Sequence, residues 1–225
     1  MANDRPPIDS ALDFEKRLIL VPVRSFDVGK SRLGDISPSN RRRLVIDLAA
    51  GVVEGLNSIA RRVVVTTTEE VANWARNQGC LAVVTSSPLN KALREALDEF
   101  GTSGGYGVVM GDIALAAKSS LSQAISSRAP SVTCDRLRVG TSIVTIPSEK
   151  VIDFKFGDDS FKSHLKEVLK SFGFTKVAMT NKNTIDIDSF EDLKALKNDL
   201  SLSKDERKRI NMMIEMTHNG AKIDL

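Results

Sequence analysis

The sequence predicts an α/β protein: a single Rossmann-like domain with a mixed, mostly parallel central sheet flanked by helices. Two observations support this fold class. Short apolar runs bounded by turn residues alternate with longer amphipathic segments along the chain. The connections between them are short, which is typical of doubly wound sheets. A length of 225 residues also suits one large domain of this class.

The predicted strands are mostly runs of apolar and β-branched side chains, which indicates burial on both faces of a sheet. They cover residues 18–23, 63–67, 81–84, 106–110, 131–134, 143–146, 176–179 and 184–188. No helix-length segment precedes residues 143–146, so we expect this strand to be an antiparallel addition to the sheet. Residues 184–188 alternate acidic and apolar side chains, a pattern typical of a strand with one exposed face.

The predicted helices carry apolar side chains at helical spacing. They cover residues 38–56, 69–78, 90–100, 119–127, 160–172, 190–197 and 204–216. Ser37-Pro38 is a typical helix start, because proline is well accommodated in the first turn. We therefore expect a flexible leader at residues 1–16, a domain at 17–200 and a C-terminal helical tail at 201–225.

Composition narrows the class of protein. No apolar run approaches the ~20 residues of a membrane span and no signal peptide opens the chain, so we expect a cytoplasmic protein without membrane contact. The net charge of +3 suits an anionic ligand, whereas the mixed charges at 204–209 favour a solvated helix over nucleic-acid binding. The two cysteines are far apart, which indicates free thiols.

A cationic loop follows the first predicted strand. Arg24, Lys30 and Arg32 lie within nine residues there, at the strand end where open α/β sheets bind ligands. Three fixed positive charges suit a polyphosphate, although an ordinary solvated loop is the alternative. Gly29-Lys30-Ser31 is not a P-loop, because the glycine required five residues earlier is replaced by Arg24.

Three aspartates indicate a metal site. Asp112 follows an apolar strand, while Asp186 and Asp188 are two residues apart and would project from one face of a strand. Carboxylates gathered without matching cations repel one another, and Mg²⁺ held by carboxylates and substrate phosphates would relieve that repulsion. The alternative makes Asp112 a helix cap and the other two solvated edge residues.

Six short motifs follow one another between Leu18 and Leu196. They are Val21-Pro22-Val23 with Gly29-Lys30-Ser31-Arg32-Leu33, Leu89-Asn90-Lys91-Ala92, Gly111-Asp112, Asp135-Arg136 with Gly140-Thr141, Phe156-Gly157-Asp158-Asp159-Ser160-Phe161 with His164, and Asp186-Ile187-Asp188 with Glu191-Asp192-Leu193. In this order they resemble the 2-phospho-L-lactate guanylyltransferase family, which includes relatives that use phosphoenolpyruvate or 3-phosphoglycerate.

The resemblance implies a fold and a reaction. The fold would be that of the sugar-nucleotide transferases, a nucleotidyltransferase fold. The reaction would join GTP to 2-phospho-L-lactate, phosphoenolpyruvate or 3-phosphoglycerate and release pyrophosphate, in the biosynthesis of the deazaflavin coenzyme F-420. Such chemistry needs no protein nucleophile, because a metal ion and cations stabilise the charge on the transferred phosphorus.

Together, the residues and the resemblance imply site roles at ten positions. We expect the nucleotide to be bound by Arg24, Lys30, Arg32 and Asn90. We expect Mg²⁺ to be held by Asp112, Asp186 and Asp188. We expect the phosphorylated acid to be bound by Thr141, Gly157 and Ser160. Lys30, Arg32 and Asp112 are also the expected catalytic residues, whereas the lone His164 is interpreted as a structural hydrogen-bonding residue.

The chain departs from the family pattern at two places. Ile113-Ala114 replaces the usual Leu-Pro, and Ser142 replaces the asparagine of many members. These changes leave two alternatives open: a nucleotidyltransferase for another small phosphate, and a catalytically silent nucleotide-binding or regulatory domain. The leader and the tail lie outside the resemblance, and a homodimer is a possible assembly.

Overall fold

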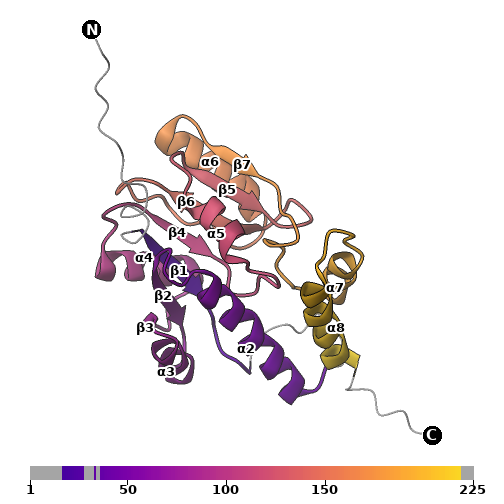
Figure 1. The fold of residues 1–225 in the computed structure, drawn as a ribbon. Helices are drawn as coiled ribbons and strands as arrows, with labels where there is room; N and C mark the ends of the chain where they lie inside the picture. The colour runs from indigo at the N-terminus through magenta and orange to yellow at the C-terminus, as the bar shows by residue number, and fades with distance from the viewer. Residues whose placement is uncertain (1–16, 28–32, 34–35, 219–225) are drawn as a thin grey trace, which may run out of the picture.

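The computed structural model describes residues 17–27, 33 and 36–218, and its centre is a seven-stranded sheet with helices on both faces (Figure 1). The strands lie in the order β3-β2-β1-β4-β6-β5-β7. Their bounds are β1 Leu18–Pro22, β2 Arg61–Thr66, β3 Leu81–Val84, β4 Tyr106–Val109, β5 Ser131–Cys134, β6 Thr141–Ile146 and β7 Lys176–Ala178. Only β6 runs antiparallel to its two neighbours, which confirms the predicted mixed sheet.

The helices also follow the sequence prediction closely. They are α2 Pro38–Gly55, α3 Glu69–Asn77, α4 Leu89–Phe100, α5 Lys118–Ile125, α6 Ser160–Phe172, α7 Phe190–Lys197 and α8 Lys204–His218. The side chain of Ser37 caps α2 by accepting a hydrogen bond from the amide of Asn40 at 3.2 Å, and Pro38 takes the first position. The strand predicted at 184–188 was wrong, because only Asp186 forms a bridge, with Ile113.

The central strand β1 is buried on both faces. Ile19 and Val21 point into one apolar cluster, which packs under α2, α3 and α5. Leu18 and Leu20 point into a second cluster, under α4 and α6. Because alternate side chains of a strand point to opposite faces, an unbroken apolar run is what a strand covered by helices on both sides requires.

The order of the strands reverses at β1. β1 pairs in parallel with β2 on one side, and on the other side it pairs in parallel with β4, which follows β3 in the chain. In open α/β sheets the crevice outside the carboxyl strand ends, at such a switch point, is the usual ligand site. The end of β4 approaches β1 closely, because a Cβ added to Gly111 would lie 2.7 Å from the carbonyl oxygen of Pro22.

A third apolar cluster joins the C-terminal helices to the rest of the domain. Leu44 and Leu48 of α2 share it with Ile185 and Ile187, and with Leu193 of α7 and Ile210 of α8. The described part of α8 thus packs against α2 and α7 (Figure 1). None of the helices in the described ranges is long and apolar enough to cross a membrane.

Candidate active site

A pocket of about 390 Å³ opens at the carboxyl ends of β1, β2 and β3. Its lining also includes the start of α4, so strand ends form one wall and a helix the other. The lining residues are Pro22, Arg24, Ser25, Val65, Thr66, Thr67, Thr85, Ser86, Ser87, Pro88, Leu89 and Ala92. Its size lies within the range usual for small-molecule sites.

The predicted cationic loop begins at this pocket. Arg24 is exposed at its lining, where the guanidinium is available to an anionic ligand. Lys30 and Arg32 lie outside the described residues. Just before them, Asp27 is held by Arg42 of α2 through an ion pair of 2.8 Å, and the same guanidinium also pairs with Glu70.

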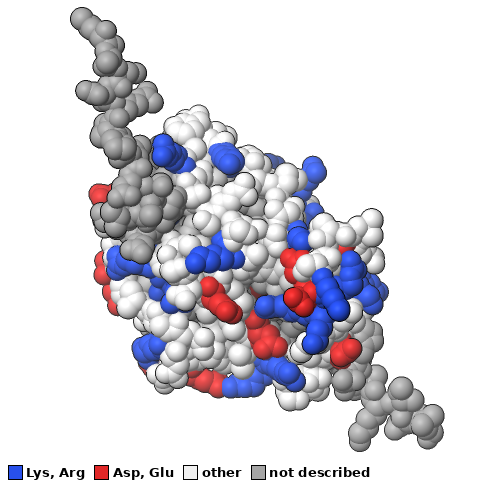
Figure 2. All heavy atoms as spheres, viewed as in Figure 1, with Lys and Arg blue, Asp and Glu red and all other residues white. Residues whose placement is uncertain are grey.

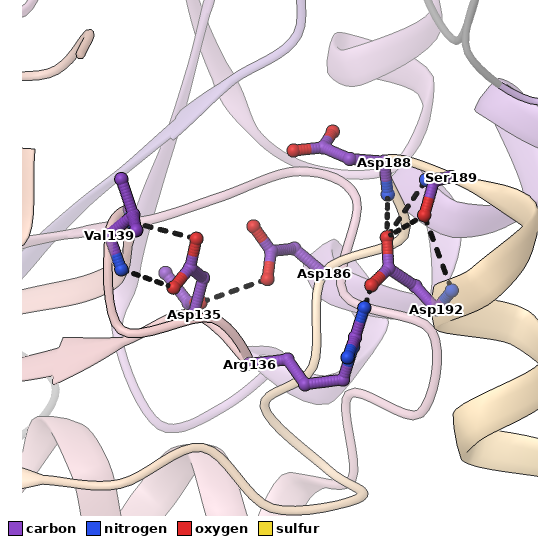
Figure 3. Close-up of polar contacts among 9 residues, drawn as sticks. Asp135, Arg136, Val139, Asp186, Asp188, Ser189 and Asp192 are labelled. Atoms are coloured by element: carbon purple, nitrogen blue, oxygen red, sulfur yellow. Dashed lines mark hydrogen bonds and ion pairs between the residues drawn. The ribbon is translucent and has the colours of Figure 1, made fainter. Parts of the chain in front are cut away.

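The two backbone segments that carry the predicted metal ligands pair with each other. The amide of Ile187 donates to the carbonyl oxygen of Asp112 at 3.1 Å, and the amide of Ala114 donates to Ile185 at the same distance. Ile185 and Ile187 are buried in the third cluster, so Asp186 and Asp188 point to the other side of their segment (Figure 3). Two segments that are more than 70 positions apart in sequence therefore lie side by side, and each of them carries acidic residues.

Hydrogen bonds hold the side chain of Asp186 and the backbone of Asp188 in place. Asp186 accepts a hydrogen bond of 3.2 Å from the hydroxyl of the fully buried Ser142. Asp188 is fixed through its backbone amide, which donates to Asp192 at 3.1 Å (Figure 3). Within the described ranges, no three His, Cys, Asp or Glu side chains are placed to hold a metal ion by themselves.

Asp192 makes several polar contacts next to Asp188. It accepts hydrogen bonds from the amide and hydroxyl of Ser189, both at 2.8 Å, and forms an ion pair of 2.9 Å with Arg136 (Figure 3). Burial opposes ionisation of Asp192, but the bonds from Ser189 and Arg136 outweigh it and lower the pKa of its carboxyl. Arg136 and Asp192 belong to two of the sequence motifs, but their ion pair was not predicted.

The residues predicted to bind the acid lie around His164. The hydroxyl of Thr141 lies 3.0 Å from Nδ1 of His164, and Nε2 of the ring accepts a hydrogen bond of 3.0 Å from the amide of Lys155. Nε2 is thus the acceptor, so Nδ1 carries the proton, and the partners of the ring on that side are the hydroxyl oxygen of Thr141 and the backbone of Ser160. Thr141 keeps its own proton for another acceptor. Burial lowers the pKa of His164 to about 4, so the ring is neutral at pH 7.

Gly157 and Ser160 frame the beginning of α6. Gly157 has φ +130°, a conformation that favours glycine, and a Cβ built there would meet nothing within 4 Å. Ser160 is buried at the first position of α6, and the residue before it, Asp159, does not cap the helix through its side chain. Backbone amides at such a helix start suit an anion.

The side chain of Asn90 contacts the backbone of Phe156. Its side-chain amide donates to the carbonyl oxygen of Phe156 at 2.9 Å and accepts from the amide of Phe156 at 2.8 Å. Both polar ends of Asn90 therefore hold the segment that leads to Gly157. Its predicted role in binding the nucleotide is not tested by these contacts and stays a prediction.

Sequence reasoning missed the hydroxyl groups of the pocket. Thr66 and Thr67 follow the apolar run of β2, and Thr85 and Ser87 follow that of β3. A polar cluster directly after each of two adjacent buried strands was the available signal, because carboxyl ends of parallel strands meet at one sheet edge. On the face drawn in Figure 2, Lys and Arg are interspersed with Asp and Glu.

Comparisons with known proteins agree with this architecture. The sequence model of the family described as "Guanylyl transferase CofC like" matches residues 17–223. The chain is 24% identical over 215 residues to a 2-phospho-L-lactate guanylyltransferase of Methanocaldococcus vulcanius, covering 91% of this chain and 95% of the relative. The relative of the same name from Methanocaldococcus jannaschii is 23% identical over 214 residues, covering 92% and 94%.

Solved structures share the fold at low sequence identity. A putative nucleotide-diphospho-sugar transferase from Desulfovibrio desulfuricans G20 has a TM-score of 0.68 at 13% identity, covering 92% of this chain and 98% of that chain. A nucleotidyl transferase from Methanothermobacter has a TM-score of 0.54 at 14% identity, covering 80% and 95%. These similarities identify the nucleotidyltransferase fold that the sequence predicts.

Proposed function

This chain belongs to the CofC-like guanylyl transferase family, and from that premise we propose that it transfers GMP from GTP to a small phosphorylated three-carbon acid. The acids proposed are 2-phospho-L-lactate and phosphoenolpyruvate, with 3-phosphoglycerate as a further candidate, in the biosynthesis of coenzyme F-420. An oxygen of the acid's phosphate attacks the α-phosphorus of GTP. The new bond joins the two phosphates, the bond from the α-phosphorus to the bridging oxygen breaks, and pyrophosphate leaves.

One observation carries the proposal: the segment of Asp112 pairs with the segment of Asp186. Pro22 lines the pocket and also contacts the turn before Asp112 at Gly111. A nucleotide in the pocket would therefore have carboxylates on one side and Arg24 at its mouth. Lys30 and Arg32, from the same loop, are proposed to bind the triphosphate.

The acidic residues fit a magnesium ion in the way that nucleotide enzymes use it. Mg²⁺ is commonly held by one or two carboxylates together with substrate phosphates, so a complete protein cage is not required. We propose that Asp112, Asp186 and Asp188 supply these oxygens. When bound, the ion would neutralise charge on the phosphates during transfer.

Thr141, Gly157 and Ser160 are proposed to bind the phosphorylated acid. Because His164 donates to the oxygen of Thr141, the threonine hydroxyl can donate its own proton to a phosphate or carboxylate oxygen. The amides at the start of α6 would add to this, since a helix N-terminus favours negative charge. Asn90 would act on the acid only indirectly, by holding Phe156.

The direct test is a screen for pyrophosphate release. The full chain with Mg²⁺ would be mixed with GTP, ATP or CTP and with each of the three acids. We expect release with GTP and at least one acid, and no release from GTP alone. Release with ATP or CTP in preference to GTP would favour a nucleotidyltransferase of another specificity. No release with any pair would favour the catalytically silent domain.

Replacing Lys30 tests the cationic loop. If Lys30 contacts the triphosphate, Lys30→Ala should weaken GTP binding by about 1.5–3 kcal/mol, the range for hydrogen bonds to charged groups. Isothermal calorimetry with GTP measures this difference. Lys170→Ala, on an exposed position of α6, is the matched control and should leave the affinity unchanged. Equal affinity of the Lys30 variant and the control would rule out the role.

A further inference from the structure

Four of the six hydroxyl groups that line the pocket donate their protons to other groups of the protein. The hydroxyls of Thr66 and Thr67 donate to the carbonyl oxygen of Arg24, at 2.7 and 3.1 Å. A carbonyl oxygen has no proton, so the direction of both bonds is fixed. Each threonine oxygen can therefore only accept further hydrogen bonds, and that of Thr66 already accepts one of 3.3 Å from the amide of Thr68.

Glu95 of α4 holds the two hydroxyls that follow the neighbouring strand, β3. The hydroxyl of Thr85 donates to one carboxylate oxygen at 2.8 Å, and that of Ser87 donates to the other at 2.7 Å. Glu95 is half-buried, and the bonds from Ser87 and Thr85 lower the pKa of its carboxyl. It is therefore an acceptor at neutral pH, and both hydroxyl oxygens are left as acceptors. That of Thr85 already accepts one bond of 3.1 Å from the amide of Ser87 and has one lone pair left for a ligand.

The pocket thus presents oxygen acceptors from four side chains, and its lining also includes Arg24, Ser25 and Ser86. The four acceptors match a ligand edge that consists of donors. Among the nucleobases, guanine alone has two adjacent donors on one edge, the N1 hydrogen and the N2 amino group. Adenine has an unprotonated N1 next to its amino group, and cytosine has an unprotonated N3. In either base this acceptor nitrogen would face an acceptor oxygen of the pocket. Polar groups left unpaired in this way are a strong source of discrimination.

We propose that this pocket binds the guanine base of the substrate, with Thr85 and Ser87 accepting hydrogen bonds from its N1 and N2 donors. Glu95 is a positioning residue, because it holds both hydroxyls with their protons turned away from the base. The inference rests on the proposed function for the identity of the nucleotide. It adds the residues that select guanine, which neither the family motifs nor the cationic loop specifies.

Equilibrium binding tests the inference without requiring turnover. Calorimetry would compare GTP, ATP and inosine triphosphate, which lacks the N2 amino group, on the full chain with Mg²⁺. We expect GTP to bind about tenfold more tightly than inosine triphosphate, the loss expected for one hydrogen bond. The double variant Thr85→Val/Ser87→Ala should weaken GTP binding about tenfold and bind the two nucleotides about equally.

Two further variants separate base recognition from a merely structural effect. Glu95→Gln can donate to the hydroxyls, so it should reduce the preference for GTP over ATP while leaving thermal stability close to that of the parent chain. Thr175→Val removes a hydroxyl that donates to the carbonyl oxygen of Pro130 outside the pocket, and should leave all affinities unchanged.

The outcomes distinguish this inference from the proposed function. If the pocket variants weaken GTP, ATP and inosine triphosphate by the same factor, the base assignment is overturned even where pyrophosphate is released with GTP. If guanine-selective binding disappears in the variants but no acid gives turnover, the base assignment is supported and the transferase proposal is not. If the parent chain binds no nucleotide, both are overturned.

Discussion

Asp112→Asn should reduce turnover with GTP and the accepted acid by about 10²–10³-fold, the loss typical when one charge-stabilising group is removed. The substitution keeps the shape of the side chain and removes its charge. The backbone segment of Asp112 pairs with the segment that carries Asp186 and Asp188. If the three carboxylates gather as proposed, removing one of the charges should leave the melting temperature without Mg²⁺ unchanged or slightly raised. Steady-state kinetics and thermal melts with and without Mg²⁺ measure both effects.

The double variant Asp112→Asn/Asp188→Asn makes the test specific for a shared ion. Residues that act through one ion are non-additive, so the double variant should be little slower than either single variant. Asp98→Asn, on the exposed face of α4, is the control and should keep full activity. Near-normal turnover in both single variants, or losses that multiply in the double variant, would show that the aspartates do not share a metal ion.

Acidification should destabilise the fold through His164. The folded-state pKa of about 4 lies below the unfolded value near 6.5, so the unfolded chain takes up the proton first as the pH falls. The stabilisation that the neutral ring provides is fully present above pH 6.5. It is lost as the pH falls toward 4, by about 3 kcal/mol, since each unit of pKa corresponds to about 1.4 kcal/mol.

Urea unfolding at several pH values between 7 and 4.5 measures this contribution. His164→Gln removes the titrating group, so the free energy of unfolding of the variant should fall less steeply over this range than that of the parent chain. The carboxylates titrate in both proteins, and the difference between the two slopes therefore reports on His164 alone. Parallel slopes would contradict the buried, neutral ring and the orientation of Thr141 derived from it.

Strand positions were predicted best where burial determines the pattern of apolar side chains. β1 and β2 required apolar residues on both faces, so their positions could be predicted within about two residues. Residues 184–188 were less predictable. Their acidic and apolar side chains alternate as in a strand, but the segment forms only a single bridge. What keeps them in place is two backbone hydrogen bonds with Asp112 and Ala114, contacts that depend on the tertiary fold.

The two departures from the family pattern acquire a physical meaning in the structure. Ala114 occupies the position where the resemblance leads one to expect proline, and its amide donates to Ile185. Proline has no such donor, so alanine secures the Asp112 turn by a hydrogen bond rather than by a fixed φ. Ser142 contacts Asp186 directly, which places the second departure next to the proposed metal ligands.

The candidate site could be predicted only in part, because long-range partners are not visible in a local pattern. The adjacency of Asp112 to the Asp186 segment followed from strand ends and spacing. The pairing of Asn90 with Phe156, and of Glu95 with Thr85 and Ser87, did not, since polar side chains at helix starts have many geometrically possible partners. Such contacts decide which atoms face a ligand.

The most direct test of the proposed reaction follows the phosphorus atoms of GTP. The full chain would be incubated with Mg²⁺, the acid that gives turnover, and GTP labelled with ³²P at either the α or the γ position. Attack on the α-phosphorus predicts that the α label enters a product that also contains the acid, whereas the γ label appears in pyrophosphate. Appearance of the γ label in the acid or in inorganic phosphate, with the α label retained in GDP, would contradict nucleotidyl transfer.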